Sequence, residues 1–323
     1  MSDAEDCLTA SPLALGCMGM SEFYSDRDAD NCAATIRAAV DSGIKLFDTA
    51  DMYGPFTNEE LLGQCLAPYR RHVMIATKFG YVRAANGTRI GLNGRPEYVK
   101  QCCDASLLRL RTDVIDLYYL HRVDLNVPIE DTVGAMSELV ENGKVRYLGL
   151  SEVAPHTIRR AQAVAPIAAL QTEYSLLARE PERDLFPLLA ELGITFVAYA
   201  PLARGLLTGR YATLESLPQN DYRRGTPRFQ GDNFYYNVSL LESLRQVAAR
   251  HGATLAQVAI SWVRQQLTNG VVLVGTTRTA HLMENLAAGP LVMSKEEITD
   301  LSAAFPVGAA RGDRYADMSR VNR

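Results

Sequence analysis

KLFDTA (45–50), VMIATKFG (73–80) and IDLYYLH (115–121) are short apolar runs that each bring a polar side chain to their C-terminal end. Near-continuous apolar runs are typical of parallel strands that are covered on both faces. Five further runs of this kind are LALGCMG (13–19), VRYLGLSE (145–152), AALQTEYS (168–175), ITFVAYAPL (194–202) and VVLVGT (271–276). Eight strands that alternate with amphipathic stretches predict an α/β protein with the (β/α)8 fold, a TIM barrel.

The ends of several helices can be predicted between these strands. Asp30 is a candidate N-cap for a helix that runs to Val40. Glu60 stands three residues after Thr57, the spacing of a capping box. Prolines suit the first position of three more helices, at Pro96, Pro155 and Pro181.

A doubly wound sheet is the alternative fold, and it would need a GxGxxG turn after its first strand. The chain has GCMGM (16–20) there, and no linker separates a second domain, so we expect one barrel domain over 1–323. Two segments lie outside the repeat, a long loop at 203–237 and a polar tail at 305–323, and the tail is either ordered or frayed. The loop carries five arginines whose repulsion a bound anion would relieve, so we expect it to close over a bound cofactor. These are Arg204, Arg210, Arg223, Arg224 and Arg228. The alternative is a rigid loop packed by its own aromatic residues, Phe229, Phe234, Tyr235 and Tyr236.

The 323-residue chain carries 33 Lys and Arg against 37 Asp and Glu, a net charge of −4. This balance gives no reason to expect nucleic acid or an anionic membrane as a partner. No apolar run reaches the roughly 20 residues that span a bilayer, and the acidic start MSDAEDC is unlike a secretory signal. We therefore expect a cytoplasmic protein with reduced cysteines and no metal site, and the oligomeric state stays open. The cysteines are Cys7, Cys17, Cys32, Cys65, Cys102 and Cys103.

Four polar residues stand at or just beyond successive strand ends: Asp48, Tyr53, Lys78 and His121. In a barrel they would meet at one mouth, where active sites of this fold lie. A phenol has a pKa of about 10, and we expect the Lys78 ammonium, oriented by Asp48, to lower the pKa of Tyr53. Neutral His121 could donate a hydrogen bond to a carbonyl oxygen that Tyr53 protonates.

The chain resembles an aldo-keto reductase over about residues 13–304. The matching strings are LGCMGMSEFY (15–24), LFDTADMYG (46–54), TKFG (77–80), DLYYLHRVD (116–124), KVRYLGLSE (144–152), LQTEYSLLAR (170–179), AYAPLARGLLTGRY (198–211) and VGTTRTAHLMEN (274–285). The resemblance implies a (β/α)8 fold, a nicotinamide cofactor and a complete catalytic tetrad. Its members would be Asp48, Lys78, His121 and Tyr53, the last as general acid and base.

The resemblance also implies a path for the cofactor along the barrel mouth. Ser151 and Gln171 would hold the carboxamide, and Tyr199 would stack on the nicotinamide ring. Leu202 and Gly205 would line the pyrophosphate, and residues 275–285 would surround the adenosine half. The full set is Cys17, Met18, Ser151, Glu152, Gln171, Tyr199, Ala200, Pro201, Leu202, Gly205, Arg210, Gly275, Thr277, Arg278, His281, Glu284 and Asn285.

Three positions depart from the commonest pattern of the family. Glu152 stands where Asn is frequent, and it keeps an acceptor for the carboxamide. Ala200 stands where Ser is frequent, and Thr277 where a Lys often binds the 2′-phosphate. We still expect NADPH as the cofactor, because a set of basic residues can contact that phosphate: Arg210, Arg278 and His281.

The substrate pocket is expected among side chains that follow the first four strands. Aromatic residues there suit a flat or apolar carbonyl compound, while Arg122 suits a polar or anionic one or a pairing with Asp124. The candidates are Tyr24, Phe56, Phe79 and Arg122, with Phe23 and Tyr81 nearby. The predicted activity is reversible hydride transfer from NADPH to an aldehyde or ketone. The alternative is a regulatory or redox-sensing subunit that binds NADPH, and whether the substrate range is broad or specific stays open.

Overall fold

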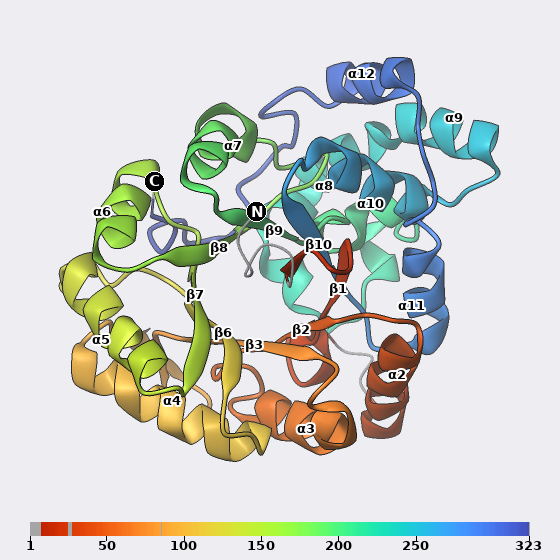
Figure 1. The fold of residues 1–323 in the computed structure, drawn as a ribbon. Coiled ribbons are helices and arrows are strands. Elements are labelled where there is room, and N and C mark those ends of the chain that lie inside the picture. The colour runs from red at the N-terminus through yellow and green to blue at the C-terminus, as the bar shows by residue number, and fades with distance from the viewer. Residues whose placement is uncertain (1–7, 25–27, 85, 323) are drawn as a thin grey trace.

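The computed structural model describes residues 8–24, 28–84 and 86–322. Its central feature is a barrel of parallel strands: β1 (Leu13–Gly16), β2 (Leu46–Asp48), β3 (Met74–Phe79), β6 (Ile115–Leu120), β7 (Val145–Ser151), β8 (Ile167–Glu173), β9 (Thr195–Tyr199) and β10 (Gly270–Gly275). The barrel closes in the order β1-β10-β9-β8-β7-β6-β3-β2. Helices surround it (Figure 1), so the predicted fold class is confirmed.

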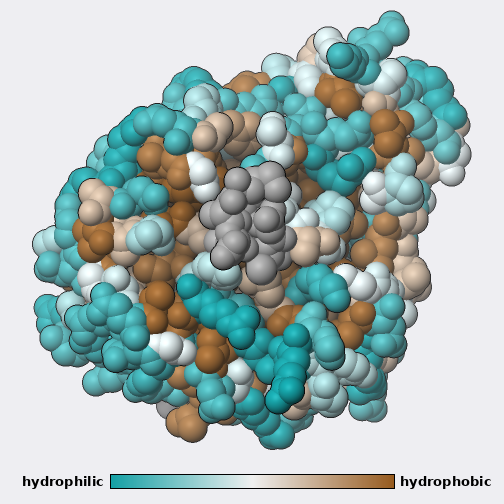
Figure 2. Space-filling model, in the orientation of Figure 1, coloured by the Kyte–Doolittle hydropathy of each residue, from teal (hydrophilic) through white to brown (hydrophobic). Residues whose placement is uncertain are grey.

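The helices form the outer layer around these strands (Figure 1). They are α2 (Ala29–Asp41), α3 (Thr57–Leu66), α4 (Pro96–Leu110), α5 (Ile129–Glu141), α6 (Pro155–Val164), α7 (Pro181–Leu192), α8 (Gly231–Ser239), α9 (Leu241–His251), α10 (Leu255–Gln266), α11 (Thr279–Leu286) and α12 (Lys295–Ala304). On the face in Figure 2, hydrophilic residues cover much of this layer, and hydrophobic residues are scattered among them.

Both faces of each barrel strand are buried, which explains the continuous apolar runs. Leu46 and Ala76 point into the barrel and pack with other inward side chains. Phe47 and Ile75, one residue further along, pack outward in the core beneath the helices. Leu8 joins the inward set. Because successive strand residues alternate between the two layers, both sides of a strand need mostly apolar side chains.

Two predicted helix starts are wrong in detail. Helix α2 begins at Ala29, and Asp28 rather than Asp30 is its N-cap, since its side chain accepts from the backbone N–H of Asn31. Helix α3 has no capping box, because its N-cap position is occupied by Phe56, with φ 70° and no side-chain bond. The three proline starts are correct, and they open α4, α6 and α7.

A short hairpin not predicted from the sequence lies beside the barrel mouth. It consists of β4 (Tyr81–Arg83) and β5 (Arg89–Leu92), which pair antiparallel. The Asn-Gly pair at 86–87 between them is frequent in hairpin turns, and it is the sequence feature from which this hairpin could have been predicted. Arg83 fastens the hairpin to the loop after β1 through Glu22, whose carboxylate it contacts at 2.5 and 2.9 Å.

The long loop after β9 is folded into short 3-10 turns before α8 begins. Burial lowers the pKa of Arg228 and Arg204 adds to this, so some of the expected arginine repulsion is present, but most of these side chains already have partners. Arg204 and Arg228 both contact Glu173, and Arg223 pairs with Asp221 at 2.7 Å. Arg224 donates to backbone carbonyls of the loop itself. The loop is therefore ordered by partners within the protein, and the expectation that a bound anion orders it is wrong.

The C-terminal tail returns across the barrel mouth and is anchored at both ends. The backbone N–H of Arg311 donates to Asn237 Oδ1 at 2.8 Å. Near the end of the chain, Asn322 Oδ1 accepts from the backbone N–H of Ala154 at 2.9 Å. The residues between these anchors are thereby held close to the C-terminal ends of β7, β8 and β9.

Candidate active site

The structure brings Asp48, Tyr53, Lys78 and His121 together at the barrel mouth. The Lys78 ammonium donates to Asp48 Oδ1 and, at 2.8 Å, to the carbonyl oxygen of Thr49. It also lies 5.3 Å from the centroid of the Tyr53 ring. The His121 ring packs edge-on against Tyr53 with 5.9 Å between centroids. A phenol, an imidazole and an ammonium therefore face one small volume.

Strand geometry explains why these polar side chains share one place. Asp48 and Lys78 each stand two residues after an inward-facing apolar residue, Leu46 and Ala76. Gln171 has the same relation to Ala169 on β8. Since every second residue of a strand points to the same side, each is the next inward position at the C-terminal end. Gln171 donates to Asp48 Oδ2 at 2.7 Å across the barrel.

Tyr53 reaches the same place from a tight turn rather than from a strand. The backbone N–H of Asp51 donates to the carbonyl of Lys78 at 3.1 Å, which ties the turn to β3. The Asn58 side chain accepts from Thr49 Oγ1 at 2.6 Å and donates to the carbonyl of Cys17 at 2.8 Å. These buried bonds connect the turn to both neighbouring strand ends and leave Tyr53 only 7% exposed.

Burial determines the charge states of the site. It raises the pKa of Tyr53 well above the ordinary value, and Asp48 adds to this, so the expected lowering is wrong in direction. Burial also lowers the pKa of His121 far below its ordinary value, helped by Arg122 and Lys78. At neutral pH the site therefore presents a protonated phenol and a neutral imidazole. Burial lowers the pKa of Lys78 and raises that of Asp48, while their mutual attraction opposes both shifts.

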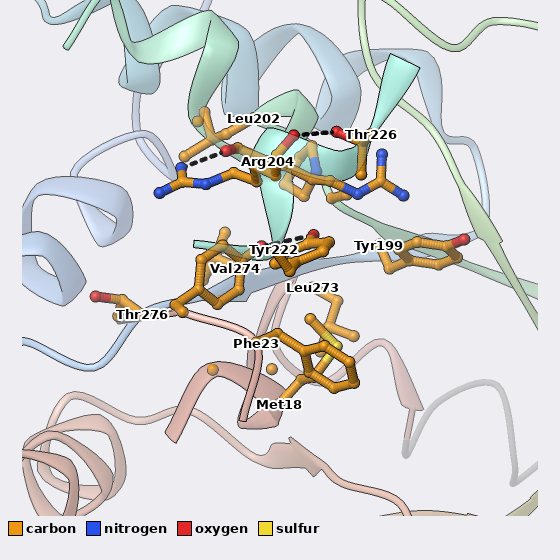
Figure 3. Close-up of a pocket in the computed structure, with 18 of the residues that line it drawn as sticks. Met18, Phe23, Tyr199, Leu202, Arg204, Tyr222, Thr226, Leu273, Val274 and Thr276 are labelled. Carbon is orange, nitrogen blue, oxygen red and sulfur yellow. Dashed lines mark hydrogen bonds between the residues drawn. The ribbon is translucent and has the colours of Figure 1, made fainter. Parts of the chain in front are cut away.

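A cavity of about 870 Å³ opens from the Tyr53 and His121 side chains and runs past the ends of β1, β9 and β10. Figure 3 shows Arg204 and Tyr222 across the cavity from Met18 and Phe23. The predicted cofactor residues that line it are Met18, Ser151, Gln171, Tyr199, Ala200, Pro201, Leu202, Gly205, Arg210, Gly275, Thr277, Arg278, His281, Glu284 and Asn285. Cys17 does not line it, because its side chain is fully buried beneath the mouth.

Positive charge gathers at the end of the cavity far from Tyr53. Partial burial, Arg210 and Arg278 all lower the pKa of His281, which shows that the three side chains are close. Glu284 acts in the opposite direction and raises the pKa of His281. At Gly275, an added Cβ would meet only the carbonyl oxygen of Gly16, at 3.6 Å. A ligand can therefore approach the backbone at Gly275 closely, beside the basic cluster of Arg210, Arg278 and His281.

The backbone just after β9 is strained. Ala200, Ala203 and Arg204 have φ of 52°, 46° and 58°, in the left-handed region that non-glycine residues avoid. Such residues cost on the order of 1–3 kcal/mol each and cluster at functional sites. Gly205, with φ 95°, follows them along the cavity wall. This concentration of strain coincides with the predicted pyrophosphate path.

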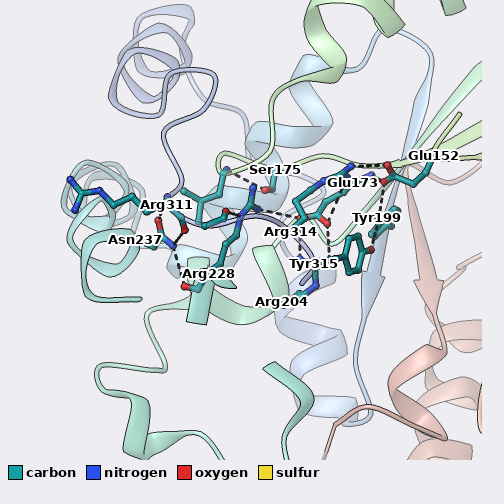
Figure 4. A network of polar contacts seen from close by, with 12 residues as sticks. Glu152, Glu173, Ser175, Tyr199, Arg204, Arg228, Asn237, Arg311, Arg314 and Tyr315 are labelled. Atoms are coloured by element: carbon teal, nitrogen blue, oxygen red, sulfur yellow. Dashed lines mark hydrogen bonds and ion pairs between the residues drawn. The ribbon is translucent and has the colours of Figure 1, made fainter. Parts of the chain in front are cut away.

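Glu152 has a different position from the one expected. Arg314 of the tail binds both of its carboxylate oxygens at 2.8 Å, and the Tyr199 hydroxyl donates to Oε1 at 2.8 Å (Figure 4). The Tyr315 hydroxyl lies 2.7 Å from that of Tyr199. Both oxygens of Glu152 are thus engaged on the side away from the cavity, so it is not placed to accept from a carboxamide. It fixes the Tyr199 ring instead.

Two of the four substrate candidates are in the wrong place. Phe79 is fully buried in the outer core and stacks on Tyr118 at 4.9 Å, because its strand position points outward. Phe56 lies under Arg109, 4.7 Å from ring to guanidinium, and does not line the cavity. Tyr24 and Arg122 do line it. Further lining residues not predicted are Arg89, Tyr222, Tyr315 and Arg320.

The chain matches the aldo/keto reductase family over residues 12–305. The chain belongs to this family. A probable aldo-keto reductase of Glycine max is 43% identical over 308 residues, which are 94% of this chain and 88% of that protein. A glycerol dehydrogenase of Gluconobacter oxydans has a similar structure, with a TM-score of 0.83, 30% identity, and 91% and 92% of the two chains covered. An aldo/keto reductase of Klebsiella pneumoniae, solved with NADP and acetate, has a TM-score of 0.72, 28% identity and 94% coverage of both chains. The protein is thus an oxidoreductase of the aldo-keto reductase class.

Three observations on the described residues bear on the other expectations. No helix among them is long and apolar enough to cross a membrane. No group of three or more potential ligands among them could hold a metal ion. Cysteines 17, 32, 65, 102 and 103 are free thiols, and Cys7 lies outside the described residues.

Replacing Arg314 by Met should destabilise the protein by about 3–5 kcal/mol, because it leaves the buried Glu152 carboxylate without its ion-pair partner. Arg311→Met is the matched control in the same tail, where the guanidinium lies over the Tyr236 ring, 3.8 Å from its centroid. It should cost about 1 kcal/mol or less. Urea unfolding of both variants measures this, and equal losses would contradict the assigned role of the Arg314–Glu152 pair.

The same pair predicts a pH dependence. Although burial opposes it, Arg314 holds the pKa of Glu152 at about 2, below its ordinary value of 4.5. A carboxylate with a lowered pKa stabilises the fold fully above its unfolded pKa and loses this effect as pH falls toward the folded value. The stability difference between wild type and Arg314→Met should therefore be largest above about pH 5 and shrink toward pH 2. A difference that stays constant over this range would exclude Glu152 as the cause.

Proposed function

We propose that the chain is an NADPH-dependent carbonyl reductase in which Tyr53 is the proton donor. The observation that carries the proposal is one continuous cavity with two different ends. One end presents Tyr53 and His121, and the other presents the basic cluster of Arg210, Arg278 and His281. The first suits a carbonyl group and the second a phosphate, and family membership supports both assignments.

The residues present fit a nicotinamide cofactor. The open backbone at Gly275 and the strained turn around Gly205 would accept the adenosine and pyrophosphate parts. Tyr199, whose hydroxyl is fixed by Glu152 and Tyr315, offers a ring for stacking. Ser151 and Gln171 line the cavity beside the tetrad, where they would hold the carboxamide. When bound, NADPH supplies the hydride for the carbonyl carbon.

The protein contributes orientation and a proton. The carbonyl oxygen of the substrate would lie between Tyr53 and His121, and neutral His121 donates a hydrogen bond to it. As negative charge develops on that oxygen, Tyr53 gives up its hydroxyl proton. The Lys78 ammonium, held by Asp48, stabilises the phenolate that remains.

The reverse reaction, oxidation of an alcohol, uses the same groups, with the Tyr53 phenolate as base. Its raised pKa keeps the phenol protonated at neutral pH. This state is ready to donate a proton, so the site favours carbonyl reduction under these conditions. The rate of alcohol oxidation should increase as the pH rises.

The Tyr53→Phe variant removes the proton donor and keeps the ring. Its turnover of a simple aldehyde should fall by about 10²–10⁴, while NADPH still binds as judged by fluorescence titration. Tyr235→Phe, on the exposed side of α8, is the matched control and should leave turnover unchanged. Near-native turnover in the Tyr53 variant would overturn the mechanism.

Cofactor preference tests the basic end of the cavity. Arg210→Met should weaken NADPH binding by about tenfold, because a charge-assisted bond to the 2′-phosphate is lost. NADH lacks this phosphate, so its dissociation constant should not change in the same variant. Calorimetric titration with both cofactors measures the effect, and a parallel loss of affinity for both would show that Arg210 does not contact the phosphate.

A further inference from the structure

Arg122 is a buried cation without a carboxylate partner among the described residues. It is 6% exposed and lines the cavity beside His121. Its hydrogen bonds to the described residues come from Nη1, to the carbonyl of His121 at 2.6 Å and to Ser151 Oγ at 3.1 Å. Both acceptors are neutral, and burying a charge without an opposite charge is costly. The remaining donors of the guanidinium are free to meet a ligand.

Nearby acidic groups do not fill this role. Burial lowers the pKa of Arg122, while the neighbouring tyrosines and Glu152 raise it, so Glu152 lies close to the guanidinium. Both of its oxygens, however, are bound by Arg314. Glu173 does not serve Arg122 either, because it pairs with Arg204 and Arg228 and lies 3.9 Å from Arg314. Arg122 is thus left with guanidinium donors that an anion from outside the protein can bind.

Two more guanidinium groups lie around the ring of Tyr81. The ring centroid is 5.0 Å from that of His121 and 5.9 Å from the carbons of both Arg89 and Arg320. Arg89 has no ion pair with a described residue, and Arg320 pairs with the exposed Asp317 at 3.4 Å. Burial lowers the pKa of His121, and Arg122 and Arg89 add to this, so both guanidinium groups lie near its ring.

We propose that this end of the cavity is a subsite for an oxyanion on the substrate, bound by Arg122 and flanked by Arg89 and Arg320. The preferred substrates are then short aldehydes or ketones that also carry a carboxylate or a phosphate. The inference rests on the proposed carbonyl reduction and adds the substrate class. The subsite is separate from the basic cluster around Arg210, which lies at the other end of the cavity and is assigned to the cofactor.

Matched pairs of substrates test the proposal. With NADPH, 4-oxobutanoate should have a kcat/KM about ten- to a hundredfold above that of its neutral methyl ester, as expected for charge-assisted hydrogen bonds. Glycolaldehyde phosphate against glycolaldehyde tests the phosphate arm in the same way. A preference in the first pair alone identifies a carboxylate site, and a preference in the second alone identifies a phosphate site.

Variants then locate the preference. Arg122→Met should remove most of the advantage of the charged substrate, and Arg122→Lys should retain part of it. Arg245→Met, which removes an exposed guanidinium from α9, should leave the ratio of charged to neutral substrate unchanged. If Arg122→Met does not fold, Arg89→Met at the exposed mouth should lower the same ratio by a smaller factor. Ratios that are equal in wild type and in the folded variants overturn the proposal.

A binding measurement separates this inference from the proposed function. Calorimetric titration of the NADP-loaded protein with butanoate and with butanamide needs no turnover. The subsite predicts at least tenfold tighter binding of butanoate, lost in Arg122→Met. If the ester is reduced but butanoate binds no better than the amide, the carbonyl reductase stands and the carboxylate site is wrong. If no carbonyl compound is reduced, the proposed function fails, and the titration still decides whether the anion site exists.

Discussion

The ammonium of Lys78 lies inside the barrel mouth with no exposed surface, and its neutralisation by Asp48 is the interaction on which the site depends. Removing two such charges from water costs several kcal/mol each, so their geometry has to be held from several directions. Gln171 supplies the second oxygen of Asp48 with a donor from β8, and Thr49 accepts from the ammonium. Only a closed barrel brings β2, β3 and β8 close enough for this.

A second charged network serves the other half of the cavity. Glu152 and Glu173 at the ends of β7 and β8 bind arginines that come from the long loop and from the tail. Through Tyr199 and Tyr315, this network reaches the cavity wall. The loop and tail that the regular repeat does not explain are therefore attached to the barrel at the place where the chemistry is proposed.

Much of this could be predicted from the sequence, and the rest had identifiable obstacles. Buried strands and inward polar residues at their ends are local patterns, so the barrel and the meeting of Asp48 with Lys78 could be inferred. The place of Phe79 depends on which face of β3 it occupies, and a shift of one residue reverses that face. The partner of Glu152 is more than 160 residues away, at Arg314, and no local pattern reveals such a contact. The pKa of Tyr53 was misjudged because burial, which the sequence does not display, raises it, and Asp48 adds to the rise.

The central claim is that the Lys78 ammonium, held by Asp48, stabilises the Tyr53 phenolate. The pH dependence of kcat/KM for alcohol oxidation, compared between wild type and Lys78→Met, tests it most directly. Oxidation needs the Tyr53 phenolate, so loss of the ammonium should move the rising limb of the profile to higher pH. At pH values below that limb, the rate of the variant should be lower than that of the wild type. A rising limb at the same pH in both proteins would contradict this account of the site.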